Sequence, residues 1–121
     1  MLLRKLPYEL TLCKVLSPAE INLYADFFFI GKTDEELSLV CLTTDVPVHT
    51  TSRNDGWRGF RVEGELDFAY ISNLSDLTTL LADKRIDIFA VSTFNTDYIL
   101  VKDAQFERAT EVLTGGGYVV E

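Results

Sequence analysis

The chain has 121 residues, of which 47% are hydrophobic and 25% are charged. A folded chain of this length buries roughly two-thirds of its unfolded surface, so it can form a core without disulfides or metals. Nineteen acidic against eleven basic residues give a net charge of -8, which repels phosphate backbones and anionic membranes and argues against nucleic acid as a partner.

The first half of the chain predicts mainly strands. Residues 8–16 are rich in strand-forming side chains. Ser17 followed by Pro18 is typical of the start of a short helical turn. Residues 27–32 and 37–42 are apolar segments joined by four polar residues, which predicts a hairpin. The segment between the strand at 8–16 and the strand at 27–32 is too short to hold a long helix.

A polar stretch over residues 45–56 is the main connection of the chain. It contains Pro47 and ends in Asp55-Gly56, both of which are turn signals. We therefore predict a boundary between two halves, residues 1–56 and residues 57–121.

The second half predicts alternating strands and helices. Ser72 or Asn73 is the expected cap of the first helix, which carries leucines at helical spacing and ends near residue 82. The predicted order is strand 57–66, helix 72–82, strand 86–93, strand 97–102, helix 104–114 and strand 118–120. This βαββαβ order is that of the ferredoxin-like fold. Shifted by 60 positions, the halves also resemble each other, so we predict a repeated unit.

The termini and the apolar runs predict a cytoplasmic protein without membrane contact. Pro7 and Glu9 interrupt the apolar stretch that a signal peptide would need. The longest apolar run, residues 27–30, is far too short to span a bilayer.

The cysteines and the single histidine do not predict chemistry. Cys13 and Cys41 lie in apolar, strand-like contexts, where thiols are usually buried as small hydrophobic groups. Nothing near His49 has the spacing of metal ligands. We therefore expect no metal, no cofactor and no catalytic residue.

The sequence Ser92 to Val101, together with residues 62–68 and 86–91, resembles the ACT-domain family. It is most similar to small bacterial tandem-ACT proteins, whose modules resemble those of the cytosolic arginine sensor of animals. The resemblance implies an α+β protein of two ferredoxin-like (βαββαβ) ACT modules, the first abbreviated, with antiparallel sheets and helices on one face. It also implies a non-catalytic regulatory protein that binds a small ligand, a free amino acid, between modules, and that forms a homodimer.

The expected ligand carries one carboxylate and one ammonium group. The amino end of the first helix offers free backbone N–H groups to the carboxylate. Asp97 is the expected acceptor for the ammonium, and the resemblance implies that Thr93 and Asp97 contact the ligand. The full predicted site is Asp67, Phe68, Tyr70, Ile71, Ser72, Thr93, Asn95 and Asp97.

Other interpretations of the same residues remain open at this point. Asp97 is also typical of a turn residue that hydrogen-bonds its own backbone. The chain could be a structural or protein-interaction module without a ligand. Two enzyme interpretations are weaker: an acylphosphatase-like phosphate loop at residues 57–61, and cysteine catalysis assisted by His49.

Overall fold

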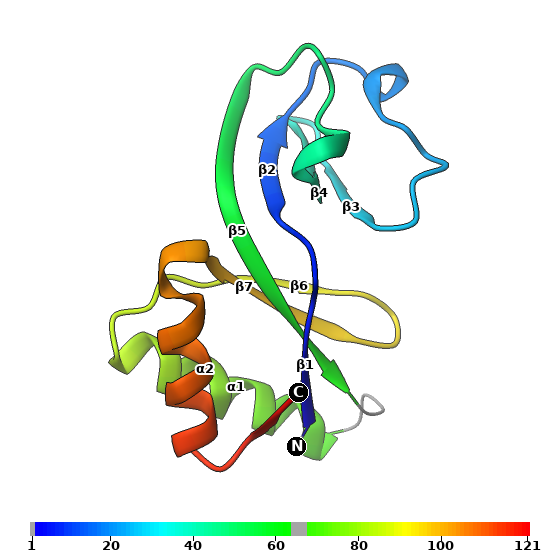
Figure 1. Cartoon of the computed structure of the whole chain (residues 1–121). Coiled ribbons are helices and arrows are strands. Elements are labelled where there is room, and N and C mark those ends of the chain that lie inside the picture. Colours follow the sequence, from blue (N-terminus) through cyan, green and yellow to red (C-terminus); the bar gives the residue numbers. More distant parts are fainter. Residues whose placement is uncertain (1, 64–67) are drawn as a thin grey trace. The chain divides into compact units, whose positions relative to one another are not determined.

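The computed structural model describes residues 2–63 and 68–121, and of residues 68–73 it describes the backbone alone. The elements in chain order are β1 (Leu2–Lys5), β2 (Leu10–Lys14), η1 (Pro18–Glu20), β3 (Phe28–Lys32), β4 (Leu37–Leu42), η2 (Thr43–Asp45), β5 (Ser52–Glu63), α1 (Phe68–Asp83), β6 (Phe89–Ser92), β7 (Asp97–Lys102), η3 (Asp103–Gln105), α2 (Phe106–Gly115) and β8 (Val119–Val120) (Figure 1). Two compact units are present. One is Tyr8–Trp57, and the other is Arg58–Glu121 together with the N-terminal residues through Pro7.

The unit Tyr8–Trp57 is an antiparallel sheet in the order β3, β4, β2 and the first half of β5. The predicted hairpin is confirmed as β3 and β4. In its turn, the hydroxyl of Thr33 accepts hydrogen bonds from the backbone N–H groups of Glu35 and Glu36. The predicted helical turn is confirmed as η1, which Ser17 caps by accepting from the N–H of Ala19. The core of this unit consists of Cys13, Val15, Ile21, Leu37, Leu39 and Cys41.

Strand β5 contains a β-bulge around Gly56. Leu10 of β2 lies opposite Trp57, but Leu12 lies opposite Asn54, so β5 holds one extra residue at this point. Gly56 adopts a φ of 82°, which residues with a Cβ rarely reach. The turn signal that predicted a connection through Gly56 is therefore a bulge signal, and the prediction of a loop from 52 to 56 was wrong.

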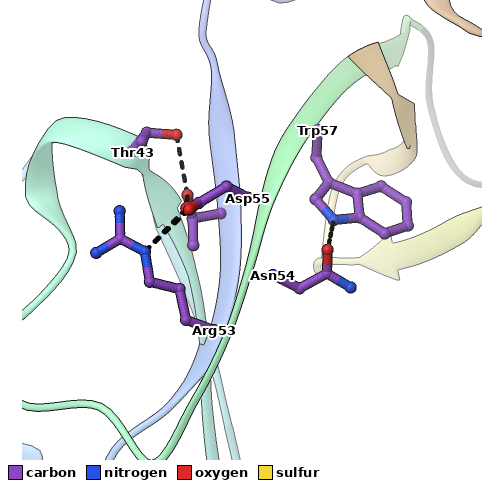
Figure 2. A network of polar contacts seen from close by, with 6 residues as sticks. Thr43, Arg53, Asn54, Asp55 and Trp57 are labelled. Carbon is purple, nitrogen blue, oxygen red and sulfur yellow. Dashed lines mark hydrogen bonds and ion pairs between the residues drawn. The ribbon is translucent and has the colours of Figure 1, made fainter. Parts of the chain in front are cut away.

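The bulge carries a network of polar contacts, shown in Figure 2. The fully buried hydroxyl of Thr11 donates to the Asp55 carboxyl at 2.6 Å and lies 2.9 Å from the Thr43 hydroxyl. The Asp55 carboxyl also accepts from Nε of Arg53 at 3.0 Å. The extra residue of the bulge therefore brings a carboxyl to the one buried hydroxyl of β2, which satisfies that hydroxyl.

The second unit confirms the predicted βαββαβ order as β5, α1, β6, β7, α2 and β8. Its sheet has the order β6, β7, β5, β1 and β8. Strand β1 lies between β5 and β8, antiparallel to the first and parallel to the second, and so adds a strand to the ferredoxin-like pattern. The sequence did not indicate β1, because a segment of four residues becomes a strand only through its two neighbours.

Both helices cover the same face of this sheet, as predicted. Phe60 of β5 and Ile99 of β7 alternate inward and join α1 and α2 in one core. The fully buried members of this core are Leu3, Phe60, Val62, Leu77, Leu81, Val101, Ala109 and Leu113. The chain is thus a small α+β protein with a ferredoxin-like fold.

Helix α1 begins earlier than the sequence predicts. Its first residue is Phe68, whereas Ser72 and Asn73 were expected to cap it. Ser and Asn favour caps but are tolerated within a helix that is held by tertiary packing. Strand β5 correspondingly ends at Glu63, three residues before the expected end of that strand.

Gly59 of β5 is predicted to tolerate no side chain. A Cβ there would lie 2.7 Å from Cδ2 of Leu100 and 3.0 Å from Cδ1 of Leu6, and both leucines are buried. Such overpacking costs about 1–3 kcal/mol, so Gly59→Ala should unfold at a lower urea concentration than the wild type. Gly115→Ala is the matched control, because nothing lies within 4 Å of that position. Equal stability of the two variants would contradict this packing.

Candidate functional site

The β6–β7 turn holds its shape through its own polar groups. Thr93 donates its N–H to the carbonyl of Thr96 at 2.8 Å. The Thr93 hydroxyl accepts from the N–H of Thr96 at 3.3 Å and lies 3.1 Å from the carbonyl of that residue. Thr93 and Asn95 are both exposed at this turn. The turn is therefore preformed, and its exposed edge carries a hydroxyl and an amide.

Asp97 is a buried residue of β7 and not a turn residue. It stands opposite Ser92 in the hairpin, and the Ser92 hydroxyl donates to its carboxyl group. The side chain of Asp97 is only 4% exposed. By the alternation of β7 it shares the helix-covered face with Ile99 and Val101. The interpretation in which Asp97 bonds its own backbone is replaced by this bond to a side chain of the neighbouring strand.

The carboxyl group of Asp97 has no cationic partner among the described residues. None of the ion pairs within 4 Å among these residues includes it, and it accepts a hydrogen bond from the neutral Ser92 hydroxyl. Burying a carboxylate is costly unless it is paired and hydrogen-bonded. Among the side chains that the structure describes, the Ser92 hydroxyl is thus the donor that meets the Asp97 carboxyl.

The topology brings Asp97 to the end of β5 from which α1 follows. Arg61 of β5 donates to the Tyr98 hydroxyl at 3.3 Å, and Gly59 lies against Leu100. These contacts align β7 antiparallel to β5, with Asp97 beside the last residues of that strand. Two parts of the predicted site, the β6–β7 turn and the start of α1, therefore belong to the same end of the sheet.

The remaining predicted residues lie at the start of α1 or before it. Asp67 lies outside the described residues. Phe68, Tyr70, Ile71 and Ser72 have helical backbones, and their side chains lie outside the described part. Because α1 begins at Phe68, the N–H groups without helical partners are those of its first turn, not those that would follow the expected cap at Ser72 or Asn73.

Ser92 is the residue that sequence analysis missed. Its role follows only from the hairpin register. A four-residue turn over 93–96 places Ser92 and Asp97 opposite each other. A pairing of the two strand ends around that turn would have indicated it.

The cysteines do not form a catalytic arrangement in this structure. Cys13 and Cys41 are buried in the core of the unit Tyr8–Trp57, whereas the His49 side chain is 81% exposed and lies 3.7 Å from Glu20. Burial, together with the neighbouring Cys13 thiol, raises the pKa of the Cys41 thiol to about 12. Burial also raises the pKa of Cys13. Neither thiol is activated as a nucleophile.

The segment proposed as a phosphate loop is part of strand β5. Residues 57–61 pair with β1 and β2 and do not open a helix. Among the described residues no cluster of three or more histidine, cysteine or acidic residues could hold a metal ion. None of the helices in the described part is long and apolar enough to cross a membrane.

A family model described as ACT domain matches residues 52–115, which is just over half of the chain. The chain therefore belongs to the ACT-domain family. The match begins at the first residue of β5 and ends at the last residue of α2, so it includes the Ser92–Asp97 hairpin. No curated protein matches the chain.

Solved structures with the same fold come from several bacteria. A protein from Agrobacterium tumefaciens is similar over 99% of this chain and 91% of its own, with 27% identity and a TM-score of 0.87. A Vibrio cholerae protein of unknown function, described as a possible transport protein, is 15% identical over 92% of this chain and 85% of its own, with a TM-score of 0.72. Aspartate kinase from Clostridium acetobutylicum, described as an allosteric enzyme, is 12% identical over 93% of this chain and 33% of its own, with a TM-score of 0.64.

The buried thiols are predicted to be unreactive in the folded protein. With a pKa of about 12, the thiolate fraction of Cys41 at pH 8 is on the order of one in ten thousand. A disulfide reagent such as Ellman's should therefore label both thiols slowly in buffer and at once in denaturant. Since burial raises both pKa values above 9.0, their contribution to stability is complete below about pH 9 and is lost as the pH rises toward 12. Rapid labelling of either thiol in buffer would contradict this.

Proposed function

We propose that this protein is a non-catalytic regulatory or sensing protein that binds a free amino acid at a site built around Asp97. Membership of the ACT-domain family supports a regulatory, ligand-binding role. The fold shared with part of an aspartate kinase that is described as allosteric supports it in the same direction. Regulation in such a protein follows from a difference in ligand affinity between two states of the chain.

The observation that carries the proposal is the buried carboxyl group of Asp97, which accepts a hydrogen bond from the neutral Ser92 hydroxyl. The ammonium group of an amino acid would supply the charge and the donors that this carboxylate lacks. Thr93 and Asn95 stand at the adjoining turn, where a hydroxyl and an amide are available to the ligand.

We assign the ligand carboxylate to the amino end of α1. The first-turn N–H groups of a helix have no partner within it and attract an anion. This end begins at Phe68 and follows the end of β5, beside which Asp97 lies. Asp67, Tyr70, Ile71 and Ser72 remain proposed contacts around the same ligand.

We also propose that the first half of the chain is an abbreviated ACT module. An offset of 60 residues relates β4 (37–42) to β7 (97–102) and η2 (43–45) to η3 (103–105). At the same offset Lys32 replaces Ser92 and Leu37 replaces Asp97. The first module therefore lacks the carboxyl group, and we expect one amino acid per chain and not two.

A homodimer is part of this proposal, because the resemblance to the ACT-domain family implies a ligand between modules. In the described part, β6 pairs with β7 alone and so leaves one edge open. An open edge strand favours pairing with a second copy. Phe89 on β6 is 38% exposed and would be covered in such a pair.

The direct test of the function is a thermal-shift screen of the twenty amino acids. A ligand well above its dissociation constant should stabilise the protein by roughly 1–3 kcal/mol through linkage. Calorimetry of the amino acid so identified should give one site per chain. The absence of a shift with every amino acid would favour the alternative, a structural or protein-interaction module without a ligand.

Asp97→Asn should weaken binding without weakening the fold. Asparagine keeps the size of the side chain and its hydrogen bond with Ser92, but it removes the charge that the ammonium would meet. A charge-assisted hydrogen bond is worth roughly 1.5–3 kcal/mol, so calorimetry should show an affinity lower by about tenfold or more. Stability should be unchanged or higher, because an uncompensated buried carboxyl is removed.

Asp87→Asn is the matched control, because Asp87 is exposed and outside the site. This variant should bind like the wild type. Equal affinities of wild type and Asp97→Asn would remove Asp97 from the site.

The proposed dimer can be tested by sedimentation at micromolar concentration. We expect a species of twice 13.7 kDa. Ala90→Pro in β6 removes an edge N–H and should shift the protein to a monomer. A wild-type protein that sediments at 13.7 kDa throughout would contradict the dimer.

A further inference from the structure

A groove of about 760 Å³ lies beside α2, at the other end of β7. Its walls come from β1, β5, η3 and α2, all within the unit that contains Arg58–Glu121. Asp97 begins β7 and Asp103 directly follows it, so the two sites are separated by about 20 Å of extended strand. The groove is thus distinct from the site around Asp97.

Arg58 is held in place at this groove, but not every N–H group of its guanidinium has a hydrogen-bond partner among the described residues. Its Cζ lies 4.3 Å from the centre of the Phe106 ring, and Phe106 also stacks on Phe60 with ring centres 4.8 Å apart. The Nε of Arg58 is buried and has no hydrogen-bond partner. The Asp103 carboxyl lies 3.6 Å from Nη1, which is too long for a hydrogen bond. The aromatic stack and the Asp103 carboxyl therefore hold the partly exposed guanidinium of Arg58 in place at the groove.

Three further charged side chains line the groove beside the Arg58–Asp103 pair. Lys5 is contributed by β1, and Glu107 and Glu111 are contributed by α2. None of these three side chains makes an ion pair within 4 Å among the described residues. Glu107 and Glu111 are one helical turn apart, about 6 Å along the axis. The strand side of the groove thus carries Lys5 and Arg58, with the Asp103 carboxyl next to Arg58, and the helix side carries Glu107 and Glu111.

We propose that this groove binds an extended zwitterion, with its carboxylate at Arg58 and Lys5 and its ammonium at Glu107 and Glu111. Side chains of opposite charge on the two walls suit a ligand that carries both a carboxylate and an ammonium group. Because the two walls face each other across the groove, these two groups should lie at opposite ends of the ligand. The volume is within the range of roughly 300–1,000 Å³ that is typical of small-molecule sites. A short peptide with free termini and an ω-amino acid both have this chemistry.

The test uses calorimetric titration of the full chain at physiological salt. Triglycine and 6-aminohexanoate are the probes, and hexanoate, hexylamine and glycine are the controls for one charge alone and for adjacent charges. We expect at least one probe to bind about tenfold or more tightly than every control. Binding of both probes indicates that charge separation suffices, and binding of triglycine alone identifies a peptide.

Two variants locate the binding. Glu111→Gln removes an exposed charge from α2, and Arg58→Lys keeps the charge but removes the planar group that stacks on Phe106. Each should weaken probe binding about tenfold. The matched controls Glu35→Gln and Arg108→Lys lie at exposed positions outside the groove and should bind like the wild type.

The test of the groove can be distinguished from the test of the amino-acid site around Asp97. Asp97→Asn should leave probe binding unchanged, and Glu111→Gln should leave the amino acid found by the screen unaffected. The inference is overturned if neither probe binds, if hexylamine, hexanoate or glycine binds as tightly as the probes, or if Glu111→Gln and its control behave alike.

Discussion

The twelve residues of β5 are the constraint on which the fold depends, because one strand supplies sheet partners to both compact units. Its first half pairs with β2, and its second half pairs with β1 and β7. Gly56 permits the extra residue between these halves by adopting a φ of 82°. Beyond it the inward positions alternate, so that Arg58 reaches Phe106 while Phe60 enters the core. The groove and the core of the second unit therefore both depend on the register of this strand.

Strand β7 links the two proposed sites in a similar way. It begins with Asp97, which is buried against Ser92, and it leads into Asp103, which lies next to Arg58. Between them the strand is buried among the helices by Ile99 and Val101. The packed middle of the strand fixes the position of a polar group at each of its ends. One well-packed strand can therefore support two separate proposed sites on one small domain.

Much of the fold could be predicted from local patterns, and the parts that could not depend on tertiary contacts. The hairpin at 28–42 and the βαββαβ order follow from apolar periodicity and polar turns, which are local properties. The glycine at position 56 indicates a backbone conformation that occurs both in turns and in β-bulges. Only the pairing of β5 with β2 shows that it is a bulge here. Within the site, Asp97 was found by resemblance, but its burial and its bond to Ser92 depend on strand register. The Arg58 groove had no signal in the sequence, because its charges come from four separate elements.

The central claim is that an amino acid binds between the β6–β7 turn and the start of α1. The most direct measurement is an amide chemical-shift titration of the isotopically labelled protein with the amino acid that stabilises it. The account predicts saturable shifts at Ser92 to Asp97 and at the first-turn amides of α1 after Phe68, with the amides of Asp103 to Glu111 unchanged. Shifts confined to Asp103–Glu111, or shifts in the unit Tyr8–Trp57 alone, would contradict it.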